Sequence, residues 1–299
     1  MGFINKSIVK LFPLVPRKIV RRFANKYIAG DKLSDAVDLA KKMNDKGIMC
    51  TMDVLGENIS TKEEAVFSTK ECIEVLEAMD KNKLDSNLSV KLTQLGLKLD
   101  LDFCLKNLLD IMSAARSFNR FVRVDMEDSS CTDDTIKTFL AARNHYADCG
   151  IVLQALLRRT YSDARELLKT RTNFRLCKGI YVEPVEIAYR KKEEVNENFL
   201  KVLRLMLESG SYVGIATHDD KLVEGAYKML DEMKKKKDKY EFQMLLGVRE
   251  NLRDKIVKDG HRLRVYIPFG EHWYAYSTRR FQENPQIISY VIKSLFTRN

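Results

Sequence analysis

Residues Phe121-Val-Arg-Val-Asp125 and Ile151-Val-Leu-Gln-Ala155 are two short apolar runs, separated by an amphipathic stretch of helical character. Short runs of this kind, bounded by charged residues or glycine, are typical of buried strands. A strand, a helix and a second strand in this order make a βαβ unit, in which the two strands are parallel. The same alternation continues from residue 31 onward, so the chain is predicted to have an α/β fold with a parallel sheet.

The chain contains eight runs that we predict to be strands. They cover residues 47–54, 88–92, 121–125, 151–155, 174–177, 212–216, 242–246 and 263–267. Helical segments between them include 61–80, where Ser60 and Glu63 have capping-box spacing, and 196–207. Eight strands with helical crossovers predict a (βα)8 TIM-type barrel over residues 31–299, preceded by a helical arm over residues 1–30. A doubly wound sheet is disfavoured because the chain has no G-x-G-x-x-G turn.

Composition limits the classes of protein and partner. The 299 residues are 45% hydrophobic and 31% charged, which suits one barrel-sized globular unit. A formal net charge of +10 favours anionic partners such as phosphates, carboxylates, nucleic acid or an anionic membrane surface. The six cysteines show no CxxC pair and the four histidines are not grouped, so we predict reduced thiols, a cytoplasmic protein and no metal site.

The amino-terminal arm is basic and partly apolar. Its longest apolar run, residues 8–15, is interrupted by Lys10 and Pro13 and is too short to span a bilayer. Two interpretations stay open for this arm: it lies on anionic lipid, or it covers one end of the barrel.

Polar residues at the ends of the predicted strands are candidates for the active site, because barrel enzymes place their chemistry at the carboxyl ends of the strands. These residues are Asp53, Glu57, Lys91, Asp125, Glu127, Gln154, Arg175, Lys178, Thr217, His218, Gln243 and Tyr266.

Several of these candidates allow more than one interpretation. Lys91, within an apolar run, could form an ion pair with a carboxylate inside the barrel, and Lys91 or Lys178 could form a Schiff base. Asp125 and Glu127 share a strand face and could act as acid and base, or could form a buried charge network near Arg123.

The last segment carries a more specific pattern. Tyr276, Arg279, Arg280 and Glu283 fall at i, i+3, i+4 and i+7, so they project from one face of a helix. Two adjacent arginines there can bind a carboxylate in a bidentate manner, although an exposed arginine pair is often only surface charge.

The sequence around this pattern resembles the proline dehydrogenase family. The resemblance is carried by Arg-Val-Tyr-Ile-Pro-Phe-Gly-Glu at 264–271 and Ala-Tyr-Ser-Thr-Arg-Arg-Phe-Gln-Glu-Asn at 275–284. Shorter matches follow the family's order at 52–57, 89–92, 124–127, 152–155, 175–181, 216–219 and 241–243. The resemblance covers roughly residues 30 to 285 and implies a distorted (βα)8 barrel that binds FAD, with its last helix over the active site.

The resemblance also implies roles for individual residues. Lys91 and Asp125 would order the site and tune protonation, and Glu57 would pair with Arg279 as a gate when the pocket is empty. The substrate pocket would comprise Lys91, Leu176, Tyr266, Tyr276, Arg279, Arg280 and Glu283, with catalytic roles for Lys91, Asp125, Arg175 and Tyr266. FAD would contact Asp125, Gln154, Arg175, Lys178, Gly179, Lys191, Thr217, His218, Gln243, Arg280 and Glu283.

The reaction implied by the resemblance is oxidation of L-proline to Δ1-pyrroline-5-carboxylate by hydride transfer from proline C5 to flavin N5. This is the first step of proline catabolism, after which the electrons pass to a membrane quinone and a separate pyrroline-5-carboxylate dehydrogenase takes the product. The protein would then be cytoplasmic or peripheral at the inner face of the membrane, and nucleic acid is not a predicted partner.

Other functions stay open at this level. They are another flavin barrel, such as a folate reductase-like protein; an oxidase of hydroxyproline or another cyclic amine; and a non-catalytic basic module that binds a membrane surface or nucleic acid.

Overall fold

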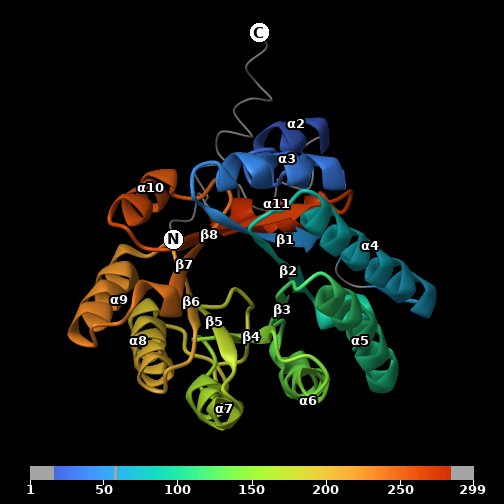
Figure 1. Ribbon diagram of the computed structural model, residues 1–299. Helices are drawn as coiled ribbons and strands as arrows, with labels where there is room; N and C mark the ends of the chain where they lie inside the picture. Colours follow the sequence, from blue (N-terminus) through green and yellow to red (C-terminus); the bar gives the residue numbers. More distant parts are fainter. Residues whose placement is uncertain (1–16, 57–58, 284–299) are drawn as a thin grey trace, which may run out of the picture.

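Eight parallel strands close into a barrel in the computed structural model, which describes residues 17–56 and 59–283 (Figure 1). The strands are β1 (Met49–Val54), β2 (Ser86–Val90), β3 (Val122–Val124), β4 (Cys149–Gln154), β5 (Asn173–Cys177), β6 (Val213–Ala216), β7 (Tyr240–Leu245) and β8 (Leu263–Phe269). Each strand pairs with its neighbour in sequence order, and β8 pairs with β1 to complete the ring. The predicted barrel is confirmed, and every strand begins and ends within two residues of its predicted bounds.

Helices surround the barrel (Figure 1). They are α2 (Arg17–Ala24), α3 (Leu33–Asn44), α4 (Lys62–Lys81), α5 (Leu101–Ser117), α6 (Thr132–Arg143), α7 (Thr160–Leu167), α8 (Lys192–Glu208), α9 (Asp220–Glu232), α10 (Glu250–Lys258) and α11 (Trp273–Glu283), with short 3-10 turns η2 (Leu92–Leu95), η3 (Ser129–Cys131), η4 (Leu168–Thr170) and η5 (Lys237–Lys239). Helix α3, which precedes the first strand, packs against both β1 and β8. The helix that follows the last strand, α11, contacts α2 instead.

The main core lies between the strands and the surrounding helices, where residues such as Leu88, Val124 and Phe199 are fully buried. Barrel strands are buried on both faces, which explains why they are nearly continuous apolar runs in the sequence. The capping box of α4 was predicted one residue too early. Thr61 and Glu64 form it, since the Glu64 amide donates to Thr61 Oγ1 at 3.2 Å and the Thr61 amide donates to Glu64 Oε2 at 3.2 Å.

Helix α11 is held over one end of the barrel by a second, smaller cluster. Tyr276 of α11 is buried with Val20 and Ala24 of α2. The guanidinium of Arg21 lies 4.7 Å from the ring centroid of Trp273, a cation–π contact that adds to this packing. The predicted carboxyl-terminal helix over the barrel is therefore confirmed.

The division into an arm at residues 1–30 and a barrel at residues 31–299 stays a prediction, because residues 1–16 lie outside the described residues. Within residues 17–56 and 59–283, no helix has the length and apolarity needed to cross a membrane.

Candidate active site

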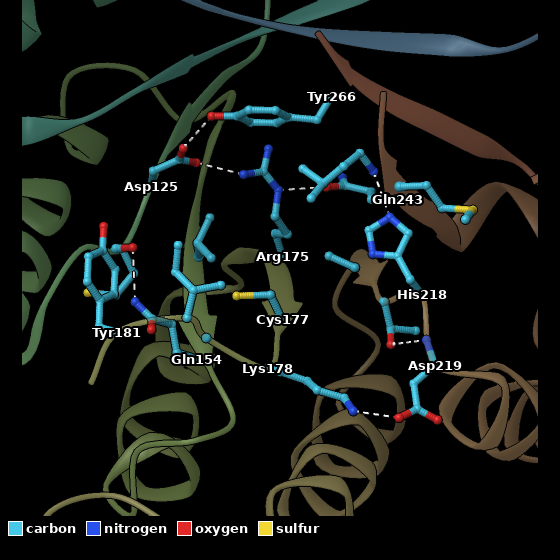
Figure 2. Close-up of a pocket in the computed structure, with 18 of the residues that line it drawn as sticks. Asp125, Gln154, Arg175, Cys177, Lys178, Tyr181, His218, Asp219, Gln243 and Tyr266 are labelled. Carbon is cyan, nitrogen blue, oxygen red and sulfur yellow. Dashed lines mark hydrogen bonds and ion pairs between the residues drawn. The ribbon is translucent and has the colours of Figure 1, made fainter. Parts of the chain in front are cut away.

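A cavity of about 580 Å³ opens at the carboxyl ends of the strands (Figure 2). A volume of this size is within the range of about 300–1,000 Å³ found for sites of small ligands and cofactors. The predicted site residues that line it are Lys91, Asp125, Gln154, Arg175, Lys178, Gly179, Thr217, His218, Gln243, Tyr266 and Tyr276. The barrel thus brings together side chains from seven different strands or strand ends and from α11.

Arg175 of β5 is the centre of a buried polar network at the base of the cavity (Figure 2). Its Nε donates to Gln243 Oε1 at 2.6 Å, and its Nη1 donates to Asp125 Oδ1 at 2.7 Å. Its guanidinium carbon lies 5.3 Å from the centroid of the Tyr266 ring. Arg175 is therefore fixed in position from three sides.

Asp125 also accepts hydrogen bonds from Ser89 Oγ at 2.6 Å and from the Tyr266 hydroxyl at 3.0 Å. Burial by itself would raise the pKa of Asp125, but the neighbouring Arg175 and Lys91 hold this pKa below its usual range. Burial, together with the charges of Asp125 and Asp53, raises the pKa of Tyr266 well above its usual value. The base of the cavity therefore holds an ionised carboxylate that accepts from a neutral phenol.

The predicted lysine–carboxylate pair inside the barrel is present. Lys91 Nζ lies 2.8 Å and 2.9 Å from the two carboxylate oxygens of Asp53, 3.3 Å from the Tyr266 hydroxyl and 3.7 Å from Asp125 Oδ2. Burial raises the pKa of Asp53 to about 6, although the positive charge of Lys91 opposes this rise. Asp53 thus lies closer to Lys91 than Asp125 does.

Sequence reasoning missed a second layer of charge beneath Arg175. Gln243 Nε2 donates to Glu241 Oε1 at 2.6 Å, and Glu241 in turn accepts from Arg264 Nε at 2.6 Å and from the Tyr212 hydroxyl at 2.7 Å. Glu241 therefore fixes the amide of Gln243 with its oxygen toward Arg175. The two-residue spacing of Glu241 and Gln243 could have predicted this contact, because it places both side chains on one face of β7.

Cations gather at the mouth of the cavity. Lys178 Nζ and Lys192 Nζ lie 2.6 Å and 3.0 Å from the same oxygen of Asp219, just before α9. Arg249 forms a two-point contact with Asp220 at 2.7 Å and 2.9 Å. Three cations thus face two carboxylates beside the amino terminus of a helix, an arrangement that attracts anionic groups. The sequence reasoning missed Lys192 and Arg249.

Gly179, also at the mouth, occupies a conformation that only glycine adopts readily. Its φ is +93°, and a Cβ at this position would lie 2.1 Å from Leu156 Cδ2 and 2.6 Å from Gln154 Oε1. The chain therefore passes close to the cavity wall at this point.

Among the residues whose side chains the structure describes, two predicted contact residues do not line the cavity. Leu176 is fully buried in the main core, because its neighbours Arg175 and Cys177 point into the barrel and alternate residues of a strand point to opposite faces. Lys191 directly precedes α8, where its backbone amide donates to Glu194 Oε2 at 3.2 Å, and the next residue, Lys192, lines the cavity instead.

The acid and base pairing suggested for Asp125 and Glu127 is not found. Glu127 accepts from the Thr93 amide at 3.0 Å and from Thr93 Oγ1 at 2.5 Å, whereas Asp125 binds Arg175. Arg123 donates to Asn173, with a distance of 2.6 Å to Oδ1, rather than to either carboxylate.

Four predicted residues cannot be placed at this site. Glu57 lies outside the described residues, and so do the side chains of Arg279, Arg280 and Glu283, although their backbone forms the end of α11. The carboxylate clamp and the gate between Glu57 and Arg279 therefore stay predictions. All six cysteines are free thiols, and within the described ranges no three His, Cys, Asp or Glu side chains group as metal ligands.

A closed parallel barrel with a charged cavity at the carboxyl ends of its strands defines a (βα)8-barrel enzyme. A family model described as proline dehydrogenase matches residues 36–292. The chain is 36% identical to proline dehydrogenase 2 of Bacillus subtilis strain 168 over 91% of this chain and 90% of that protein. It is 31% identical to the proline dehydrogenase of Deinococcus radiodurans, over 93% and 92% of the two chains. The chain belongs to the proline dehydrogenase family and is an oxidoreductase of that family.

A solved structure agrees in fold. The structure of proline utilization A (PutA) from Bdellovibrio bacteriovorus, inactivated by N-propargylglycine, superposes with a TM-score of 0.82 and 26% identity. The match covers 88% of this chain, which spans only 32% of that larger protein.

Proposed function

We propose that this protein oxidises L-proline to Δ1-pyrroline-5-carboxylate with FAD as its cofactor. The observation that carries the proposal is the buried Arg175 network at the base of a cavity whose mouth is lined with cations, in a chain of the proline dehydrogenase family. Hydroxyproline or another cyclic amine is the alternative substrate.

The residues of the cavity fit FAD in their chemistry. Lys178, Lys192 and Arg249 supply positive charge for the pyrophosphate, and Gly179 lets the backbone approach the cofactor closely. Arg175 and Gln154 are buried polar groups that line the cavity, and they would face the flavin ring. When bound, FAD supplies the electron-accepting centre at N5 that takes a hydride from C5 of proline.

The chain's own residues bind and orient the substrate. Tyr266 and Tyr276 present apolar ring surfaces to the cavity, which suits the pyrrolidine ring of proline. Arg279 and Arg280 bind the proline carboxylate, and Glu283 supports the amine side of the pocket. The ion pairs of Lys91 with Asp53 and of Arg175 with Asp125 keep the base of the cavity rigid, as positioning a reacting carbon requires.

The bound flavin would supply the electrons to a membrane quinone, and a separate dehydrogenase would take the product. The basic residues of the amino-terminal arm support a peripheral contact with anionic lipid.

An anaerobic absorbance spectrum of the purified protein, before and after addition of L-proline, tests the proposal. We expect a flavin band near roughly 450 nm that L-proline bleaches and that trans-4-hydroxy-L-proline bleaches less. A flavin band that L-proline leaves unchanged would indicate that another amine is the substrate. A colourless protein that cannot be reconstituted with FAD would refute the cofactor assignment.

The carboxylate clamp makes a separate prediction. Arg280→Met should raise the apparent KM for L-proline at least roughly tenfold, because a charge-assisted hydrogen bond contributes on the order of 1.5–3 kcal/mol. Steady-state kinetics with a soluble dye as electron acceptor would measure the change. An unchanged KM would refute the role of Arg280 in binding the carboxylate.

A further inference from the structure

Residues 179–187, in the connection between β5 and α8, reverse the usual placement of side chains. Glu183 is the one buried residue of this stretch, whereas Val182 is 90% exposed and Val185 51%. Burial of a carboxylate costs free energy unless hydrogen bonds replace its contacts with water. The position of Glu183 must therefore be maintained by the groups that it binds.

Glu183 binds the segment that follows β3. Its Oε1 accepts from the Ser129 amide at 2.8 Å, and its Oε2 accepts from Ser129 Oγ at 2.5 Å. Ser129 begins the 3-10 turn η3 and lies 54 positions earlier in the sequence. These two hydrogen bonds, here called the Glu183–Ser129 tie, join the ends of two barrel strands that are not neighbours.

The segment that carries Ser129 is itself fixed. Gln154 Nε2 donates to the carbonyl of Met126 at 3.0 Å and to the carbonyl of Glu127 at 2.7 Å. The Glu127 carboxylate accepts from the amide and the hydroxyl of Thr93. The Glu183–Ser129 tie therefore attaches the connection between β5 and α8 to a firmly held point.

The middle of the connection has little else to hold it. Its two ends are fixed by backbone hydrogen bonds of 2.7–2.9 Å to Leu156 and Arg158. Between these ends, Arg158 Nε donates to the Val185 carbonyl at 3.4 Å, which is long for a hydrogen bond of this type. The aliphatic side chains here are exposed, so apolar burial contributes little. The Glu183–Ser129 tie is thus the main restraint on the middle of the connection.

The same connection forms one wall of the cavity. Lys178, Gly179, Ile180 and Tyr181 all line the cavity (Figure 2). Glu183 follows two residues after Tyr181 and does not line the cavity. Any effect of Glu183 on a bound cofactor is therefore exerted through the position of this wall.

We propose that Glu183 is a positioning residue for the cofactor: the Glu183–Ser129 tie holds the wall at residues 179–181 against bound FAD and so slows the release of FAD. The proposal rests on the proposed function, because FAD is the ligand that is retained. It adds a residue outside the cavity that controls how long the cofactor stays.

The test measures how fast FAD leaves the purified holoenzyme after dilution, as free flavin that passes a filter. Glu183→Ala should release FAD at least roughly tenfold faster, because hydrogen bonds to an ionised group are among the stronger ones in proteins. Glu183→Gln should restore slow release, since its amide oxygen can accept from the Ser129 amide and its NH2 group can donate to the Ser129 hydroxyl. Glu186→Ala changes an exposed acid of the same connection and is the matched control, with an unchanged release rate.

Two further measurements keep the test independent of folding and of flavin. Ser129→Ala removes one of the two hydrogen bonds, so it should release FAD faster than the unchanged protein but more slowly than Glu183→Ala, and it carries the test if Glu183→Ala does not fold. Chymotrypsin cleavage after Tyr181, identified by mass spectrometry, reports the opening of the connection without reference to FAD.

Faster release of FAD and faster cleavage after Tyr181 in Glu183→Ala, both reversed in Glu183→Gln, support the proposal. An unchanged release rate in Glu183→Ala overturns it, and so does faster release without faster cleavage. Equally fast release by Glu186→Ala would assign the effect to the charge of the connection and also overturn the proposal. A protein that binds no FAD would contradict the proposed function, whereas the cleavage after Tyr181 tests the Glu183–Ser129 tie on its own.

Discussion

Arg175→Lys is expected to lower kcat/KM for L-proline at least about a hundredfold. The guanidinium connects Asp125 and Gln243, which are 50 and 68 residues away in the sequence, through bonds of 2.7 Å and 2.6 Å. Lysine keeps the charge but has one compact ammonium group, which cannot reproduce the planar fork. Two charge-assisted bonds contribute about 3 kcal/mol or more together, and each 1.36 kcal/mol corresponds to about a tenfold change in rate.

Arg159→Lys is the matched control for this prediction. Arg159 also bridges two carboxylates, Asp133 at 2.6 Å and Asp163 at 2.8 Å, but it does not line the cavity. Its substitution should leave kcat/KM nearly unchanged. If Arg175→Lys kept more than about a tenth of the original kcat/KM, the buried network would not control the reaction.

Glu241→Gln is expected to lower the free energy of unfolding by about 3–5 kcal/mol, because it leaves Arg264 buried without its carboxylate partner. The same change removes the charged acceptor that orients the Gln243 amide. Denaturant unfolding followed by circular dichroism would measure the loss. Glu232→Gln, which breaks an exposed ion pair with Arg204, should cost no more than about 1 kcal/mol and serves as the control.

The contribution of Glu241 to the free energy of unfolding should decrease as the pH falls. Burial alone would raise its pKa, but Arg264, Tyr212 and Gln243 lower the pKa of Glu241 from 4.5 to about 2. A lowered pKa adds stability above pH 4.5, about 3 kcal/mol here, and this stability is lost as pH falls toward 2. The stability gap between the unchanged protein and Glu241→Gln should therefore be about 2 kcal/mol smaller at pH 3 than at pH 6. An equal gap at both pH values would contradict the assignment of this pKa.

The strands could be predicted because the pattern that identifies them lies within a few contiguous residues. A barrel strand such as β4 is buried on both faces, so its apolar run and its flanking polar residues are visible along the chain. The polar residues at the strand ends followed from the fold class, since a parallel barrel collects them at one rim. The capping box was predicted one residue too early, at Ser60 instead of Thr61, because the two neighbouring residues have the same chemistry.

For Leu176, the strand period and the family resemblance point in different directions. Its neighbours Arg175 and Cys177 face the cavity, and the two-residue period of β5 was enough to place Leu176 on the opposite face. The place of Leu176 in the substrate pocket, which the resemblance implies, stays a prediction.

By itself, the sequence determined the order of strands and helices, the class of fold and the family, because periodicity and motif order are properties of contiguous residues. Only the tertiary structure decided which charges meet: Asp53 with Lys91, Asp125 with Arg175, and Glu241 with Gln243 and Arg264. These partners come from different strands, or from the inner face of one strand, and composition allows many other pairings among them. Closure of the barrel selects one pairing, because a buried charge is stable only beside the partner that the strand register places within hydrogen-bonding distance.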